Sequence, residues 1–140
     1  MLLGERTAEE IKCLIGNAVE FEREREFNAL MRGRDLKTGL PKMVKATPKD
    51  IRDALKGPVQ EIIAGVKDAI EDTPAELIAD VVKNGMVLAG GTALLRGIDR
   101  LMAHELKIPV RVAKDPLTCV VRGCGKLLDD AILLKTVRIK

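Results

Sequence analysis

Two groups of residues in this sequence have types and spacings that suit contact with a charged, hydroxyl-bearing ligand. The first is Gly90-Gly91-Thr92, which ends a short apolar run of strand type and precedes apolar residues at helical spacing. A strand, glycine turn and helix can bring backbone N–H groups against an anion, and glycine has no Cβ to keep a ligand away. Thr92 is expected to cap the helix and to offer a hydroxyl. The alternative is a tight turn with no ligand.

The second group is the charged pair Glu9 and Lys12, three positions apart on a predicted helix. The helix is expected over about residues 8–18, with Thr7 and Glu10 as a capping box. A carboxylate and an ammonium group on one helix face can bond ligand hydroxyls, or can form an ordinary surface ion pair. The residue types alone leave both uses open.

The composition is that of an ordinary folded domain. The chain has 140 residues, of which 46% are apolar and 32% charged, so it can bury a sizeable core and is unlike a disordered or membrane-embedded chain. The longest nearly apolar run, residues 85–95, is too short to cross a bilayer, and the early charges argue against a signal peptide. The three cysteines form no Cys-x-x-Cys pair, which favours a reducing cytoplasm over a disulfide or zinc scaffold.

The charge and the aromatic content of the chain limit the classes of binding partner that it is expected to have. The net charge is only +3, basic residues are spread along the chain, and two phenylalanines are the only aromatic residues. A nucleic-acid stacking surface is therefore not expected. His104 is the single histidine, which argues against a histidine metal cluster and places it on a solvated helix face.

The elements that position the two groups follow from periodicity and turn signals. Strands at residues 27–32 and 40–46 flank a turn and predict a hairpin, after a charged run at residues 20–26 that is expected to be a solvated connector. Two helices should follow, capped by Thr47 and Thr73.

The second half alternates strands and helices, which predicts an α/β layer. A helix is expected to run directly from Thr92 to about Leu106, and Asp115-Pro116 should open the last main helix. We therefore expect a smaller inserted α+β lobe at residues 1–72 and part of a large α/β lobe at residues 73–140.

These motifs, in this order and spacing, resemble the C-terminal half of the actin-like ATPase superfamily, and most closely the MreB family of bacterial rod-shape-determining proteins. The segments that carry the resemblance are GERTAEEIK at 4–12, RGRDLKTGLP at 32–41, TPAEL at 73–77, LAGGTALLRG at 88–97 and DPLT at 115–118. A sugar kinase or chaperone of the superfamily would share only the general layout. The resemblance implies an α/β actin-like ATPase fold, C-terminal half.

The resemblance also implies a nucleotide, ATP or ADP with Mg²⁺, bound between two lobes. The matching positions are Glu9, Lys12 and Gly16 beside the ribose and adenine, Gly90, Gly91 and Thr92 beneath the α-phosphate and ribose, and Leu94 on the bordering helix. Thr92 departs from the third glycine common in the family. No catalytic residue and no metal ligand is expected in this chain, because the family carries them on its N-terminal half.

The implied role is part of a cytoskeletal ATPase that forms filaments at the inner face of the cell membrane, maintains rod shape and guides cell-wall synthesis. Its implied partners are filament protomers, cell-wall synthesis and morphogenesis proteins, and the inner membrane through the N-terminal half. This chain alone should not hydrolyse ATP. The alternatives are a half-site of a small-molecule kinase, a short regulator that caps filaments, and a truncated reading frame with no role of its own.

Overall fold

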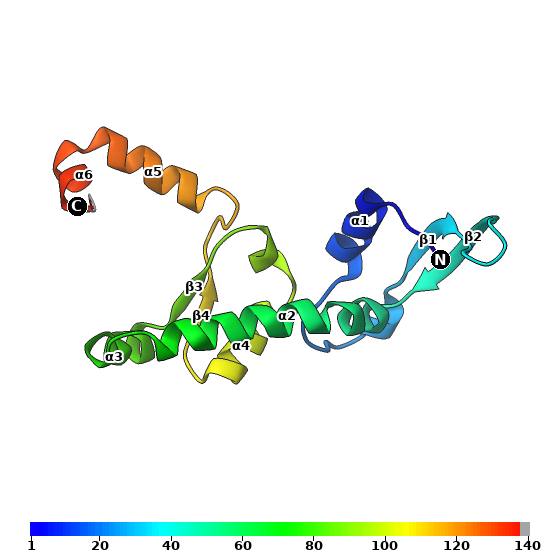
Figure 1. Ribbon diagram of the computed structural model, residues 1–140, viewed down its shortest axis with the longest axis horizontal. Helices are drawn as coiled ribbons and strands as arrows, with labels where there is room; N and C mark the ends of the chain where they lie inside the picture. The colour runs from blue at the N-terminus through cyan, green and yellow to red at the C-terminus, as the bar shows by residue number, and fades with distance from the viewer. Residues whose placement is uncertain (138–140) are drawn as a thin grey trace.

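The computed structural model describes residues 1–137 and shows an elongated molecule organised along one long helix, α2 (Pro48–Glu71) (Figure 1). Helix α1 (Glu5–Ile15) and a hairpin lie beside the N-terminal end of α2. A two-stranded sheet and its helices lie beside the C-terminal part of α2. Helix α2 therefore runs from one group of elements to the other, and the division at residues 72 and 73 stays a proposal.

Helix α1 begins and ends three residues earlier than predicted. Gly4 is its N-cap and makes no side-chain capping bond, so the predicted capping box of Thr7 and Glu10 is wrong. Thr7 lies inside the helix, because helical backbone bonds already begin with Ala8 N–H donating to Gly4. The helix ends before Gly16, whose backbone is extended. This earlier end frees residues 16–19 to run as a separate connector.

The predicted hairpin is confirmed as β1 (Ala29–Arg34) paired antiparallel with β2 (Pro41–Ala46). Its turn is organised by Asp35, whose carboxylate accepts the N–H groups of Lys37 and Thr38 and contacts Lys42 Nζ at 2.7 Å. A small core of four buried residues joins the hairpin to α1: Ile11, Ile15, Ala29 and Ala46.

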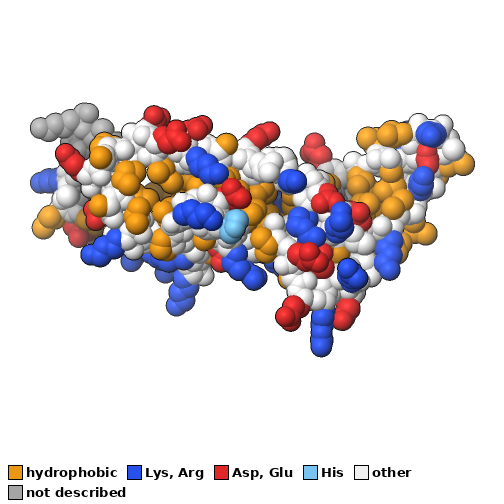
Figure 2. Space-filling model, turned by 90° about the horizontal axis from the view of Figure 1, so that it is seen from below, with side chains coloured by type: hydrophobic (Ala, Val, Ile, Leu, Met, Phe, Trp, Pro, Cys, Tyr) orange, Lys and Arg blue, Asp and Glu red, His pale blue; other side chains and the backbone are white. Residues whose placement is uncertain are grey.

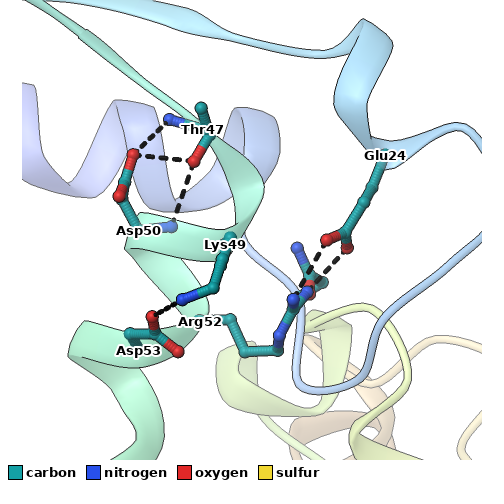
Figure 3. Close-up of polar contacts among 7 residues, drawn as sticks. Glu24, Thr47, Lys49, Asp50, Arg52 and Asp53 are labelled. Carbon is teal, nitrogen blue, oxygen red and sulfur yellow. Dashed lines mark hydrogen bonds and ion pairs between the residues drawn. The ribbon is translucent and has the colours of Figure 1, made fainter.

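Helix α2 starts where the sequence predicts. Thr47 accepts the Asp50 backbone N–H while the Asp50 carboxylate accepts the Thr47 backbone N–H (Figure 3). Such a reciprocal cap satisfies backbone donors that the first helical turn leaves free. Further along, α2 packs against helix α4 (Ile98–Leu106) through a second core of buried residues: Val59, Ile63, Ile98 and Met102.

Helix α3 (Ala75–Asn84) follows without the predicted threonine cap. The Thr73 hydroxyl donates to the Ala69 carbonyl at 2.7 Å, so Thr73 closes α2, and Pro74 is the N-cap of α3. Gly85 ends α3 at φ 71°, where a Cβ would lie 2.1 Å from the Pro109 carbonyl oxygen. Only glycine fits this left-handed, crowded position.

The strand–turn–helix segment is built differently from the prediction. Strand β3 (Met86–Leu88) pairs in parallel with β4 (Val110–Val112), as an α/β layer requires. The prediction of a continuous helix from Thr92 to Leu106 is wrong, because a 3₁₀ turn, η2 (Gly91–Leu94), precedes α4. Gly97 caps α4 at φ 75°, a left-handed conformation that interrupts the helical path. Thr92 therefore caps no α-helix.

The C-terminal elements project away from the rest (Figure 1). Helix α5 (Cys119–Asp129) begins later than predicted, because Asp115 accepts the Thr118 hydroxyl and its carbonyl accepts the Cys119 N–H in a turn before the helix. Helix α6 (Ala131–Val137) follows, and residues 138–140 lie outside the described residues. Within residues 1–137, no helix combines the length and apolarity that crossing a bilayer requires.

Hydrophobic side chains remain on the surface at both ends of the molecule. Figure 2 shows them over the hairpin end, where Leu36, Leu40 and Met43 are exposed. Exposed apolar residues also lie on α5 and α6, for example Leu128 and Ile132. Exposed apolar area of this extent is unusual for a complete monomeric domain.

Candidate functional site

The connector that leaves α1 lies beside the turn that follows β3. Asn17 and Arg96 form a parallel β-bridge, and the Ala18 N–H donates to the Arg96 carbonyl at 2.8 Å. A Cβ on Gly16 would lie 3.4 Å from Leu95 Cδ1, so Gly16 is next to the end of η2. Segments 80 residues apart are thereby held together, and they carry members of both predicted nucleotide-contacting groups.

The two glycines of the turn leave their surroundings open. Gly90 has φ 87°, and no heavy atom lies within 4 Å of the Cβ that another residue would carry. Gly91 is nearly as free, with only Leu117 Cδ2 at 3.8 Å. A ligand can therefore approach the backbone here, although the Gly90 N–H already donates to the Pro116 carbonyl at 2.7 Å.

The remaining predicted residues of the turn sit on η2 and not on a long helix. Thr92 is exposed, and its carbonyl accepts the Leu95 N–H that ends the 3₁₀ turn. Leu94 is the last residue of η2, so its predicted place on the bordering helix is wrong. Its side chain is 56% exposed and can make apolar contact with a ligand. The short 3₁₀ turn offers no α-helical N-terminus at Thr92 for anion binding.

Glu9 and Lys12 form an ion pair on α1, with Glu9 Oε2 2.6 Å from Lys12 Nζ. The hydrogen bond from Lys12 lowers the pKa of Glu9, so the carboxylate stays ionised at neutral pH. The Glu9 side chain is 62% exposed and the Lys12 side chain 40%. Among residues 1–137, no hydrogen bond or ion pair joins these two side chains to the turn at 90–94. The two side chains contact each other and, through Glu9, Cys13, all within α1.

Sequence reasoning missed a buried polar cluster of Asn17, Glu24 and Arg52. Arg52 Nη1 donates to Asn17 Oδ1 and to Glu24 Oε2, both at 2.6 Å, and Arg52 Nη2 donates to Glu24 Oε1 at 3.0 Å (Figure 3). Asn17 is fully buried and Glu24 is 7% exposed. The prediction that residues 20–26 form a solvated connector is thus wrong at Glu24.

The electrostatics of this cluster follow from its geometry. The hydrogen bonds from Arg52 lower the pKa of Glu24, and Glu24 in turn raises the pKa of Arg52. A two-pronged guanidinium–carboxylate contact is directional as well as strong. One signal in the sequence could have revealed it: Arg52 lies three residues before Leu55 and seven before Val59, on the apolar stripe of α2.

Two hollows border the cluster, and Arg52 lines both. The larger, of about 610 Å³, lies against α2, with Val59 and Ile63 on its apolar side and Lys67 and Glu105 at its rim. The smaller, of about 370 Å³, is lined by Glu20, Glu24 and Arg25 and by residues at the start of α2. None of the seven predicted nucleotide-contacting residues lines either hollow. Across the described residues there is also no group of three side chains placed to hold a metal ion.

Comparison with known proteins decides the family. The family model described as "MreB/Mbl protein" matches residues 1–136. This chain belongs to the MreB/Mbl family. The cell shape-determining protein Mbl of Bacillus subtilis is 42% identical over 130 residues, which are 93% of this chain and 38% of that protein. The cell shape-determining protein MreB of Escherichia coli is 48% identical over 128 residues, which are 91% of this chain and 36% of that protein.

Solved structures agree with the MreB/Mbl assignment. MreB5 of Spiroplasma citri bound to ADP superposes with a TM-score of 0.88 at 34% identity and covers 97% of this chain and 40% of that one. A non-polymerising MamK mutant bound to AMPPNP has a TM-score of 0.71 at 20% identity, covers 93% of this chain and 39% of that one, and shows the fold alone. The fold is therefore the actin-like ATPase fold, and the chain spans well under half the length of the relatives that it matches.

Proposed function

We propose that this chain is one portion of an MreB-type cytoskeletal protein and holds the adenosine side of an ATP or ADP site. The observation that carries the proposal is the pairing of the connector after α1 with the segment after η2, through Asn17, Ala18 and Arg96. That pairing joins the end of α1, the helix that carries Glu9 and Lys12, to the segment that follows Gly90-Gly91-Thr92. The MreB5 relative is described as bound to ADP in one structure and to AMPPNP in another, which supports a nucleotide as the ligand.

Each predicted residue has a role that suits its surroundings. Glu9 and Lys12, whose side chains are 62% and 40% exposed, would bond ribose hydroxyls and the adenine edge. Gly16 follows one turn later, where its missing side chain lets the connector pass close to the end of η2. Gly90 and Gly91 would let the α-phosphate approach bare backbone. The seven proposed contacts are Glu9, Lys12, Gly16, Gly90, Gly91, Thr92 and Leu94.

Hydrolysis is proposed to need groups from outside this chain. Mg²⁺ bound with ATP would neutralise phosphate charge, and its ligands are expected on the N-terminal half of the parent protein. This chain alone would grip the adenosine and contribute filament contacts, with no turnover of its own. The parent would assemble with other protomers in the cytoplasm at the inner membrane face, where it would position cell-wall synthesis enzymes.

The test is an equilibrium titration of this chain with a fluorescent ATP analogue. Gly91→Val places a side chain where the fold has room but the phosphate would lie. We expect about tenfold weaker binding or worse, with an unchanged melting temperature, because a bulky group excludes the ligand without disturbing the core. Gly57→Ala is the matched control, since its Cβ also enters open space but lies on α2, away from the turn.

Two outcomes would overturn the proposal. One is a wild-type chain that binds no nucleotide, and the other is a Gly91→Val variant that binds as tightly as the wild type. Steady ATP turnover by the purified chain would separately contradict the assignment of hydrolysis to the absent half. The mass of the protein in source cells, probed with an antibody against this chain, would separate a portion of a long MreB from a short filament regulator.

A further inference from the structure

The cluster of Asn17, Glu24 and Arg52 bears on the proposed nucleotide site through the connector. Asn17 accepts Arg52 through Oδ1 and donates through Nδ2 to the Ile15 carbonyl at 3.2 Å, at the last residue of α1. The next residue, Ala18, donates its N–H to Arg96. One fully buried side chain therefore joins α2 to the end of α1, and the backbone beside it pairs with the segment that leaves η2.

The connector lies outside regular secondary structure, so its position depends on contacts with the elements around it. It has left the helix at Gly16, its backbone is not part of either two-stranded sheet, and within residues 1–137 its one β-bridge is the bridge to Arg96. Ala18 also packs against the core between α2 and α4. Gly97 packs so tightly on the connector that a Cβ there would lie 2.4 Å from Val19 Cγ2. The connector is therefore clamped between α2 on one side and residues 95–97 on the other.

The three hydrogen bonds of Arg52 are suited to fixing the position of the connector. A guanidinium has a planar, rigid set of donors, so simultaneous bonds to Glu24 and Asn17 restrict where both acceptors can lie. The exposed fractions of the Arg52 and Glu24 side chains are 20% and 9%, so solvent screens the contact weakly. An ordinary surface ion pair would not fix a neighbouring backbone in this way.

We propose that Arg52 is a positioning residue for nucleotide binding, which fixes the connector and with it the separation between the end of α1 and the turn at 90–94. The inference rests on the proposed function for its ligand. Arg52 lies on α2, is absent from the seven proposed contacts and touches no nucleotide itself. It acts by fixing Asn17. The neighbouring Ala18–Arg96 hydrogen bond then keeps a constant distance between the contacts on α1 and those in the turn at 90–94.

The experiment compares amide hydrogen exchange and ATP-analogue binding in the full chain. Arg52→Leu removes all three hydrogen bonds of Arg52. Arg52→Lys keeps the positive charge but loses the planar set of donors that bonds Glu24 and Asn17 together. Lys49→Leu is the control. Lys49 forms an exposed ion pair with Asp53 on the same helix at 2.5 Å, so its loss removes a charge contact without touching the connector. The Gly85 N–H, bonded to Val81 in α3, is the internal reference for exchange.

In Arg52→Leu, the exchange rate of the Ala18 amide should rise about tenfold relative to that of Gly85, and the affinity for the ATP analogue should fall about tenfold. Arg52→Lys should lie between Arg52→Leu and the wild type in both readouts. Lys49→Leu should match the wild type in both readouts. If Arg52→Leu does not fold, Arg52→Lys carries the test.

Equal acceleration at Ala18 and Gly85 would mean general destabilisation and would overturn the proposal, as would selective acceleration with unchanged affinity. A wild-type chain that binds no analogue would overturn the nucleotide assignment, while the exchange ratio would still decide whether Arg52 fixes the connector.

Discussion

Two ion pairs in this molecule have almost the same length and opposite surroundings. Glu9 and Lys12 lie 2.6 Å apart on one face of α1, three residues apart, with side chains that are 62% and 40% exposed. Glu24 and Arg52 also approach to 2.6 Å, but they are largely buried and come from segments 28 residues apart. Contact distance alone therefore says little about the role of a charged pair.

Burial and sequence separation distinguish the two pairs. The exposed pair is formed within one helix, so it orders nothing beyond its own turn and can exchange its partner for a ligand. The buried pair satisfies groups that would be costly to leave alone, and Arg52 also bonds Asn17, which joins the connector to α2. We infer that the first pair is available for binding and that the second shapes the site from outside.

The largest expected difference is in stability. Glu24→Ala should lower the free energy of unfolding by about 3 kcal/mol, because it leaves the Arg52 guanidinium largely buried without its carboxylate. Glu9→Ala should leave chemical denaturation unchanged, since water replaces Glu9 as the partner of Lys12. Equal denaturation midpoints for the two variants would contradict the division drawn between the pairs.

A smaller effect is expected at the glycine that packs on the connector. Gly97→Ala should cost about 2 kcal/mol, because alanine is strained at φ 75° and its Cβ would overlap Val19. Gly39→Ala, at φ 72° in the open hairpin turn, should cost about 1 kcal/mol from backbone strain alone. Thermal denaturation of both variants measures the difference, and a Gly39 variant as unstable as the Gly97 variant would rule out tight packing at the connector.

The smallest effect is a pH dependence confined to the exposed hairpin. The hydrogen bond from Lys42, with help from the Lys37 and Thr38 amides, lowers the pKa of Asp35 from 3.8 to about 2. Because the folded pKa is depressed, the stabilisation is complete above pH 3.8 and is lost as the pH falls through about 2. NMR titration of the Asp35 carboxyl should give this value in the wild type and a value closer to 3.8 in Lys42→Ala. An identical titration in both proteins would mean that Lys42 has no part in it.

Local patterns in the sequence predicted the elements that depend on nearby residues. The hairpin followed from two short apolar segments around a turn, and the start of α2 followed from Thr47, Pro48 and Asp50, whose capping contacts span three residues. The family resemblance rested on motifs of about ten residues and is confirmed over residues 1–136. Structure that depends on contacts between nearby residues, and the family to which the motifs belong, can therefore be predicted from the sequence.

The errors have both local and distant causes. Thr73 has the residue type of an N-cap, yet its hydroxyl bonds to Ala69, four residues earlier in α2. The helix predicted from Thr92 is instead interrupted where Gly97 packs on Val19, a residue far away in the chain. Glu24 lies in a run of alternating charge that is typical of a solvated segment. Its burial depends on Arg52, 28 residues later.

The sequence by itself therefore determined the family, the hairpin, the long helix and the residue types suited to a nucleotide, because each depends on neighbours within one or two turns. Only the tertiary structure decided that the connector meets the turn after β3, and that Arg52 closes a buried cluster behind it. Both contacts join residues that are far apart in the chain. Their free energy comes from burial and hydrogen-bond partners that no single segment carries.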